Sequence, residues 1–448
     1  MTSGNSTGNR SAYYTLGILF LVSVLAATDR HVLSILVDDI RGDLGITDVQ
    51  FSLLSGFAFS MCFALFGIPL ARLVDQKSRP KILGLAVLVW SLATMLSGFA
   101  RTFMHLLAAR IFVGIGEAVE APGGTSMVAD LFARRNLSKA LAVVSLGGLL
   151  GSAGALAGGG LILAWGGDTG NVSVPLLGEL RAWQLVFILA GLPGLLIGPL
   201  LFFTVRDPER QRLMRDADGV PEKVSYGRVL RFIRDQRMTV ICTAGGYICY
   251  AFAALGFNAW NPSYLIRTHQ VSPGTVGVTL GSAQIIIALC TMAFNSWWID
   301  RGLHAGRLDA PLRLSRAYAM IGLAGVLMLP FWWSQQSAFA GVFVVMFANT
   351  GILAISVAHA RMLPNQIRAQ YAATYMLAVQ LTAGIFGPLV VASATQYVFA
   401  DDAAVGKSIA LVSGTAFVAA ITLLGFARAP FRSTVALYDL PDQPSRQD

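Results

Sequence analysis

The stretch AYYTLGILFLVSVLAATDRHVLSILV, residues 12–37, sets the class of the fold, because it is apolar enough to cross a bilayer yet places Asp29 beside Arg30. A helix needs about 20 mostly apolar residues to cross the roughly 30 Å hydrocarbon layer. A charged side chain at the centre of that layer costs about 2.5–3.5 kcal/mol on insertion scales. We therefore expect this pair to face a water-filled cavity or partners of opposite charge.

The composition of the whole chain is that of an integral membrane protein. Its 448 residues are 55% hydrophobic and 13% charged, more hydrophobic and less charged than soluble domains. We predict an all-α protein with transmembrane helices at residues 12–37, 50–72, 82–100, 103–132, 139–165, 183–205, 239–266, 272–298, 316–334, 338–360, 371–397 and 408–427. The first resembles a secretory signal, but its hydrophobic pattern continues past Arg30, so we expect it to be retained.

The basic residues are distributed unevenly between alternate loops. Of the 33 Lys and Arg residues, 26 fall in the two tails and in the loops on their side of the membrane, whereas 5 fall in the opposite loops. The positive-inside rule then predicts that both termini are cytoplasmic. The formal charge of +9 is explained by this bias, and we expect no nucleic-acid partner.

A polar segment at 206–238, beginning RDPERQRLMRDADG, separates six predicted spans from six. Two pairs of loops suggest that the halves are repeats, since Asp75 precedes Asp300 by 225 residues and Phe132 precedes Leu363 by 231. We predict a six-helix bundle at 1–205, a cytoplasmic linker at 206–238, and a second six-helix bundle with a short cytoplasmic tail at 239–448.

The fourth predicted span carries further charges. It reads LLAARIFVGIGEAVEAPGG, residues 106–124, and contains Arg110, Glu117 and Glu120. Arg110 and Glu117 are seven residues apart, which places them on one face of a helix about two turns apart. We expect Asp29 to meet Arg110 at a similar depth, while Arg30 turns toward Glu117 or water.

Two roles fit these charges. They could be an ionic staple between helices, although buried ion pairs add little net stability over apolar packing. We favour a proton-coupling role for Asp29, Arg30, Arg110 and Glu117, because moving an acid away from its arginine partner lets it bind a proton. In the second half no Asp or Glu falls mid-membrane, so we expect coupling to reside in the first six helices.

The second half offers aromatic and amide side chains instead, as in GFNAWNPSYL at residues 256–265. Such a wall suits a large, partly apolar substrate. The candidate substrate-cavity residues are Tyr247, Asn258, Trp260, Asn261 and Gln380. Ordinary packing or interfacial roles explain each of them equally well when it is taken singly.

The remaining polar and small residues predict little chemistry. Four histidines lie near span ends, where we expect solvated roles: His105, His269, His304 and His359. The four cysteines fall inside spans, so we expect packing roles, no disulfide framework and no metal site. The fifth span, SLGGLLGSAGALAGGG at 145–160, predicts a close-packed seam at Gly147, Gly151 and Gly154, which could also serve as a hinge.

Two stretches of the first half resemble a known family. ATDRHVLSILVDDIRGDLGITDVQFSLLSGFAFSMCFALFGIPLARLVDQKSR and RIFVGIGEAVEAPGGTSMVADLF are similar to the major facilitator superfamily, and within it to the bacterial branch of the spinster (Spns) family. In the second half GFNAWNPSYL and GIFGPLV are similar but looser. The resemblance implies two pseudo-symmetric six-helix bundles around a central cavity, with alternating access, in a bacterial inner (plasma) membrane.

The same resemblance implies a cytoplasmic gate. Asp75 and Arg79 match the superfamily's gating loop, and Asp300 with Arg301 occupies the corresponding loop of the second half. Ala71, Ser78 and Gln76 depart from that loop's usual residues, and Ala27 lies where an aromatic residue commonly precedes the Asp-Arg pair.

We therefore expect a proton-coupled transporter of an amphipathic, lipid-like substrate of the sphingolipid or lysophospholipid type. It should act as a monomer, with the proton gradient as its energy source and with no cofactor. A related branch that carries organic anions or drugs is the closest alternative, and a non-transporting receptor on the same fold is a weaker one. No Ser-His or metal-ligand arrangement indicates an enzyme.

Overall fold

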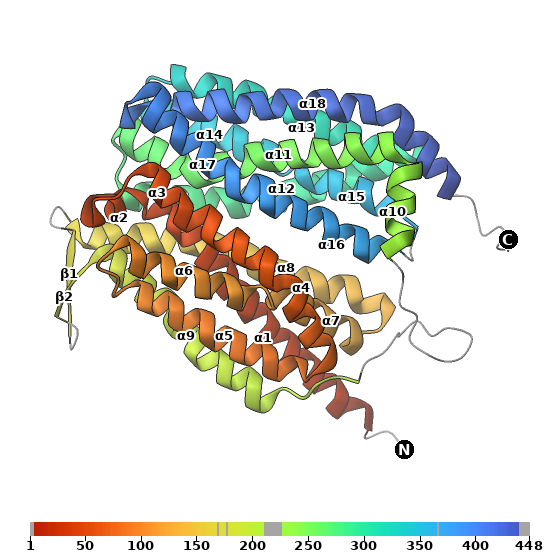
Figure 1. Ribbon diagram of the computed structural model, residues 1–448, viewed down its shortest axis with the longest axis horizontal. Helices are drawn as coiled ribbons and strands as arrows, with labels where there is room; N and C mark the ends of the chain where they lie inside the picture. The colour runs from red at the N-terminus through yellow and green to blue at the C-terminus, as the bar shows by residue number, and fades with distance from the viewer. Residues whose placement is uncertain (1–3, 168–169, 176–177, 210–225, 365–366, 439–448) are drawn as a thin grey trace. The chain divides into compact units, whose positions relative to one another are not determined.

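The computed structural model describes residues 4–167, 170–175, 178–209, 226–364 and 367–438. Within these ranges the chain forms long helices and one small β-hairpin (Figure 1). The middle of the predicted linker, residues 210–225, lies outside the described residues.

The first half of the chain contains nine of the labelled helices and the hairpin. The helices are α1 (Gly4–Val32), α2 (Val37–Leu44), α3 (Asp48–Ser52), α4 (Phe59–Gln76), α5 (Arg79–Ser97), α6 (Phe103–Glu117), α7 (Glu120–Leu131), α8 (Arg134–Trp165) and α9 (Ala182–Thr204). Between α8 and α9, β1 (Asn171–Val174) and β2 (Gly178–Arg181) pair antiparallel, with Val172 opposite Leu180.

The second half contains α10 to α18. Their bounds are α10 (Tyr226–Asp235), α11 (Arg237–Ser263), α12 (Pro273–His304), α13 (Ala310–Met328), α14 (Gln335–Asn349), α15 (Ile352–Met362), α16 (Arg368–Val379), α17 (Ile385–Ser393) and α18 (Val405–Tyr438). Single π-helical turns occur at Leu53–Ala58, Tyr264–Thr268, Gln380–Gly384 and Ala394–Phe399, and 3₁₀ turns at Leu33–Ile35, Leu329–Phe331 and Asp402–Ala404.

Eleven helical stretches of the described residues are long and apolar enough to cross a membrane. The stretch without a single spanning helix is the predicted span 103–132. There α6 ends at Glu117 and α7 begins at Glu120, so two shorter helices replace one. The tenth predicted span has a similar interruption between α14 and α15.

The described residues form two compact units. Unit 1 comprises residues 1–219, 259–285 and 392–405, and unit 2 comprises 220–258, 286–391 and 406–448. In unit 1, α5 packs along α9 and α1 packs along α8, whereas α13 packs against α14 and α15 in unit 2. The predicted division at 206–238 stays a prediction, because segments of the second half belong to unit 1.

Glycines allow α8 to approach α1 closely. A Cβ added at Gly151 would lie 2.2 Å from Val24 O, and one at Gly147 would lie 2.6 Å from Phe20 O. A Cβ at Gly154 would meet nothing within 4 Å. The predicted seam is therefore confirmed at Gly147 and Gly151 and was wrong at Gly154.

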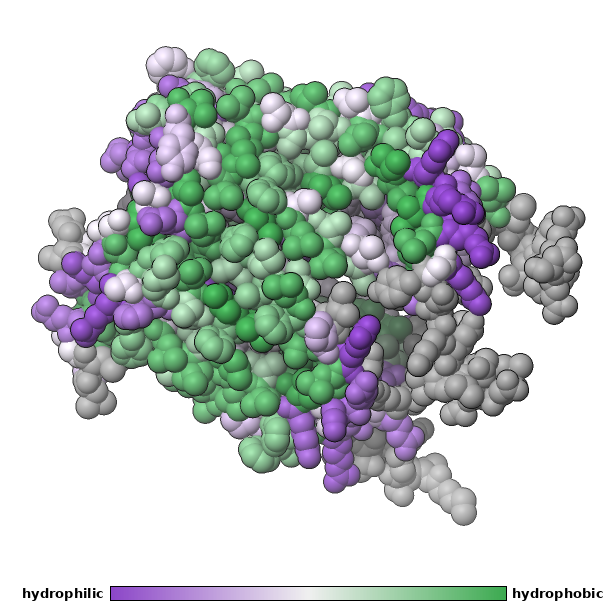
Figure 2. All heavy atoms as spheres, in the orientation of Figure 1, coloured by the Kyte–Doolittle hydropathy of each residue, from purple (hydrophilic) through white to green (hydrophobic). Residues whose placement is uncertain are grey.

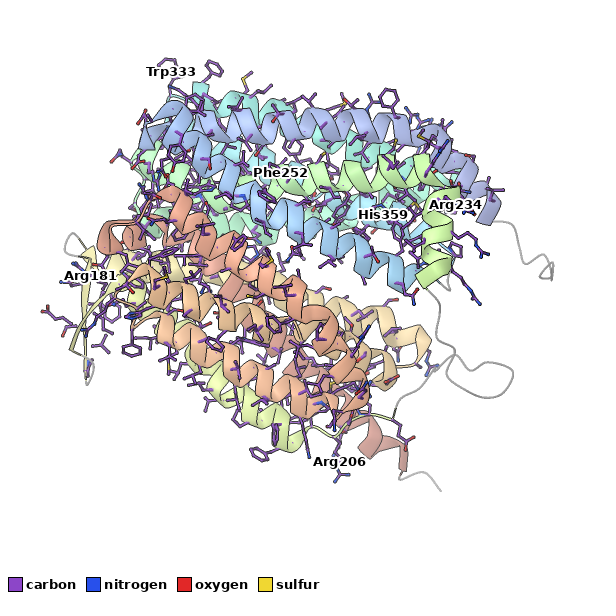
Figure 3. The ribbon with its side chains drawn as sticks, in the orientation of Figure 1. Arg181, Arg206, Arg234, Phe252, Trp333 and His359 are labelled. Carbon is purple, nitrogen blue, oxygen red and sulfur yellow. The ribbon has the colours of Figure 1, made fainter. Side chains whose placement is uncertain are left out.

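The surface polarity fits a membrane protein. On the face shown in Figure 2, hydrophobic residues cover the sides of the helices and hydrophilic residues gather toward their ends. In unit 1, Arg181 on the hairpin and Arg206 after α9 mark the two opposite ends (Figure 3). We call the end of unit 1 that carries β1 and β2 the hairpin end.

Candidate functional site

Arg30 of α1 lies between two acidic residues at the break between α6 and α7. Its Nε is 3.3 Å from Glu117 Oε2, and its Nη2 is 3.7 Å from Glu120 Oε2. The Nε–H donates its hydrogen bond to Ala26 O at 3.1 Å. Neither carboxylate oxygen of Glu117 has a hydrogen-bond donor among the described residues, although its side chain is only 1% exposed.

Asp29 is also buried, with 2% of its surface exposed. Arg110 and Thr94 lie close enough to interact with its carboxylate. The expected direct contact with Arg110 is nevertheless absent from the described contacts, because Arg110 Nη2 donates to Ser97 Oγ at 3.2 Å. The Arg110 guanidinium instead lies over the ring of Phe187, 5.1 Å from its centroid.

The four predicted coupling residues thus share one buried region of unit 1. Two acids and two arginines cancel in formal charge, and only Arg30 is substantially exposed, with 37% of its side chain accessible. Because burying a charge is costly unless it is paired and hydrogen-bonded, weakly bonded acids here are candidates to bind a proton. The coupling role itself stays a prediction.

The predicted cytoplasmic gate is only partly visible. Arg79 begins α5 at the end opposite the hairpin, and its Nε is 2.8 Å from Asp207 Oδ1. Its guanidinium also pairs with Asp130 at the end of α7. The side chain of Asp75 lies outside the described residues. In unit 2, the Arg301 guanidinium stacks on Trp297, 5.8 Å from the ring centroid, and Asp300 has no described ion pair with it.

The five candidate substrate residues are not gathered into one described cavity. In unit 1, Trp260 is 1% exposed and Asn261 is 6% exposed, so both are packed. In unit 2, Asn258 Oδ1 accepts a hydrogen bond from Asn349 at 3.3 Å, Tyr247 lies in an aromatic cluster, and Gln380 begins a π-helical turn. Their part in substrate binding stays a prediction.

An ion-pair network at the hairpin end was missed by the sequence analysis. Arg267 makes a bidentate contact with Asp48, at 2.9 Å for each Nη, and its Nε is 2.5 Å from Asp38 Oδ1. Arg41 Nε lies 2.9 Å from Asp48 Oδ1, and Arg41 Nη2 lies 3.1 Å from Asp402 Oδ2. All five residues belong to unit 1. We call them the hairpin-end network.

The network is set in an apolar surround. Asp48 is 1% exposed, and the Arg267 guanidinium lies 5.5 Å from the ring centroid of Trp260, which in turn packs edge-on against Phe51. Bidentate, desolvated pairs of this kind are strong and geometrically specific. The sequence showed these residues only as scattered charges in separate loops, because their pairing spans more than 200 residues.

Asp39, next to the network, has an unusual environment. Burial, and then the charge of Asp38, raise its pKa to about 6 from a usual value of 3.8. The opposite case occurs at Asp309 in unit 2. Burial alone would raise its pKa, but hydrogen bonds from Arg428, Arg432 and Arg313 outweigh burial and hold the pKa below its usual value.

His359 corrects the expectation of a solvated histidine. It is 2% exposed, and neither ring nitrogen has a hydrogen-bond partner among the described residues. Its ring centroid lies 4.8 Å from that of Tyr375, 5.8 Å from that of Tyr247 and 5.9 Å from that of Tyr371. Figure 3 shows it within unit 2, well inside the helix ends. His105 and His304 are exposed, as expected.

The part of the chain that the structure describes contains no group of three His, Cys, Asp or Glu side chains placed to hold a metal ion. All four cysteines are free thiols.

Comparison with known proteins now identifies the family. The sequence profile described as Major Facilitator Superfamily matches residues 19–388, most of the chain. The chain belongs to the major facilitator superfamily. It is thus an integral, multi-pass membrane transporter of small molecules rather than an enzyme, which confirms the predicted class of protein.

Individual relatives of this superfamily member are more distant. It is 28% identical over 294 residues to an MFS-type efflux pump of Mycolicibacterium smegmatis, an alignment that covers 66% of this chain and 64% of the relative. It is 27% identical over 290 residues to Protein spinster of Drosophila melanogaster, covering 64% and 44%. The chain thus matches less than two thirds of the length of either relative.

Solved structures support the superfamily fold. A bacterial homologue of the human lysosomal transporter Spinster, solved in an inward-facing, unoccupied conformation, aligns with a TM-score of 0.75 and 22% identity, covering 95% of this chain and 97% of that one. Its inward-facing, occupied conformation aligns with a TM-score of 0.74 and 23% identity, covering 97% and 99%. The predicted twelve-helix superfamily fold and the resemblance to spinster proteins are therefore confirmed.

Proposed function

We propose that this superfamily member couples proton movement to transport of an amphipathic, lipid-like molecule by alternating access. The observation that carries the proposal is the buried group of Asp29, Arg30, Arg110 and Glu117. Ionisable residues inside a membrane protein usually mark an ion or substrate pathway. Here two acids lie beside two arginines, and Glu117 has no hydrogen-bond donor among the described residues.

The proposed coupling follows from the contacts of Arg30. Its guanidinium is shared between Glu117, Glu120 and the Ala26 carbonyl, so a small shift of α1 against α6 changes which acid it neutralises. An acid that loses its cation inside the protein binds a proton more readily. Proton binding and helix movement are then one event.

Alternating access also needs contacts that form and break at each end. The hairpin-end network, which joins α2 and α3 to segments of the second half, fits an outer gate. The inner gate would involve Asp75, Arg79, Asp300 and Arg301. This orientation places both termini in the cytoplasm of a bacterial cell, with the hairpin outside. We propose a monomer with no cofactor, driven by the proton gradient.

The decisive experiment uses purified protein in liposomes and a panel of lipids, drugs and organic acids under an imposed pH gradient. Asp29→Asn should abolish gradient-driven flux, whereas Glu179→Gln, which changes an exposed carboxylate on β2, should leave flux intact. Unchanged pH dependence in Asp29→Asn would refute the coupling proposal.

The competing function is transport of organic anions or drugs. It is favoured by the similarity to the efflux pump and to a hexuronate transporter of Bacillus subtilis, 28% identical over 265 residues. The same panel separates these substrates from lipid-like ones. The absence of flux for every compound would favour the receptor alternative.

A further inference from the structure

A cavity of about 260 Å³ lies between α12 and α15 within unit 2. None of the five predicted substrate residues lines it. Ligand sites for whole drug-sized molecules usually measure about 300–1,000 Å³. The cavity is therefore of a size to take one part of an amphiphile, such as a head region with the start of its chain.

Most of the wall is apolar. Met292 and Leu353 form exposed parts of it, with 62% and 54% of their surfaces accessible, and Val357 is 39% accessible. Ile299, which is 6% exposed, lies deeper. Such a surface favours contact with hydrocarbon over contact with water.

Asp300 supplies a negative charge to this wall. Its side chain is exposed, and it has no ion pair or hydrogen bond among the described residues. The nearest cation in sequence, Arg301, has its guanidinium stacked on Trp297. A carboxylate without a counter-ion beside an apolar wall attracts a cation.

Asn295 supplies a hydrogen-bond donor. Its Oδ1 accepts from the Tyr318 hydroxyl at 2.8 Å, and this bond fixes the orientation of the amide. Its Nδ2 has no partner among the described residues, although Asn295 is only 7% exposed. A buried donor left without an acceptor costs about 1–3 kcal/mol, so an acceptor atom on a ligand would relieve that cost.

The two polar groups lie at a defined spacing. Asp300 follows Asn295 by five residues on the same helix, which separates them by roughly 7.5 Å along the axis. We propose that this cavity binds an amphiphile with a positively charged amine, the amine at Asp300, an ester, amide or hydroxyl oxygen toward Asn295, and the alkyl chain against Met292, Leu353 and Val357. The proposal rests on the proposed function and names its substrate class.

The test measures binding by the purified protein in amphipol, with three probes that share a ten-carbon chain, each kept below its micelle concentration. The probes are decyltrimethylammonium, decyl sulfate and decyl maltoside, and calorimetry gives each Kd. We expect the parental protein to prefer the ammonium. Asp300→Asn should weaken the ammonium about tenfold, equal to about 1.4 kcal/mol, and leave the other two unchanged.

Two further variants control the result. Asp235→Asn removes another exposed carboxylate of unit 2, outside the cavity, and should change no Kd. Val357→Trp fills the cavity and should weaken all three probes. Because Asp300 has no described bonds, its variant should keep the parental Tm. Equal Kd values for the ammonium in Asp300→Asn and the parent, or sulfate bound as tightly as ammonium, would overturn the proposal.

The outcome is separable from that of the proposed function. If Asp29→Asn keeps its pH-dependent flux while Asp300→Asn loses ammonium binding, coupling fails and the substrate class stands. If flux is proton-driven but ammonium binding does not depend on Asp300, the substrate class fails alone.

Discussion

Glu117 and Asn349 end two helices that break at the same point of the repeat, 232 residues apart. Each ends a helix of 15 residues, α6 or α14, and each is followed after two residues by a further helix, α7 or α15. Glu117 lies 3.3 Å from Arg30, whereas the Asn349 amide donates to Asn258 at 3.3 Å. The second half therefore keeps the break and replaces a charged pair with neutral amides.

We predict that Glu117→Gln reduces flux driven by a pH gradient by about tenfold, a loss of about 1.4 kcal/mol. The amide keeps the size of the side chain but cannot exchange a proton. Glu120→Gln is the matched control, because Glu120 lies farther from Arg30 and is 17% exposed. Liposome flux at several gradients measures both variants, and equal losses would show that Glu117 has no special role.

Substitutions in the hairpin-end network should have graded effects on stability. Asp48→Asn leaves Arg267 and Arg41 facing a neutral group in a buried site, so we expect a loss of about 3–5 kcal/mol. Asp402→Asn removes a carboxylate that is 64% exposed and should cost less than about 1 kcal/mol. Thermal unfolding in detergent compares the two. A larger effect at Asp402 would contradict the assignment of Asp48 as the centre.

Asp39 predicts a pH dependence of stability. Its pKa is about 6 in the folded protein and 3.8 as a free side chain, raised by burial and then by Asp38. The folded state therefore holds a proton that the unfolded state releases between pH 4 and 6. Stability should be greatest below about pH 4, should fall as the pH rises to about 6, and should level off above it. The span of that fall is at most about 3 kcal/mol.

Asp39→Asn is the corresponding test. The variant should lack this part of the pH dependence, and at pH 7 it should be more stable than the parent, because no charge is buried. Unfolding midpoints from pH 4 to pH 7 measure the difference. Parallel pH profiles for the two proteins would show that Asp39 titrates as an ordinary exposed acid.

The α1–α8 seam predicts opposite outcomes for two glycines of one helix. Gly151→Ala puts a methyl group 2.2 Å from Val24 O, so we expect a loss of about 1–3 kcal/mol as α8 shifts outward. Gly154→Ala meets nothing within 4 Å and should stabilise the helix by about 0.5–1 kcal/mol. Thermal unfolding separates the variants, and similar shifts for both would argue against a tight seam.

The fold was largely predictable because membrane spans are written in local sequence. Apolar stretches of sufficient length mark helices wherever the backbone must satisfy its own hydrogen bonds. The break at Glu117 was not predictable by that criterion, since residues 103–132 stay apolar throughout. The close contacts of Gly147 and Gly151 followed from their spacing, whereas the open position of Gly154 depends on where the neighbouring helix diverges.

The candidate site was predictable only in part. Charges within spans, such as Asp29 and Arg110, are conspicuous because they are costly there. Arg267 gave no such signal, since charged loop residues are common and its partners lie in distant segments. His359 was misjudged for a related reason. Its distance from the end of a span suggested solvent, but three tyrosines from α11 and α16 cover it.

The β-hairpin offers a handle on the transport cycle from outside the cell. Arg181 of β2 holds Asp43 of α2 at 2.9 Å, and Trp183 donates to the same carboxylate at 3.1 Å. Since α2 also carries Arg41 of the network, movement of that helix should be transmitted to the strands. A fluorophore attached at the hairpin, or a nanobody raised against it, would report or arrest the opening of intact cells' transporters without entering the membrane.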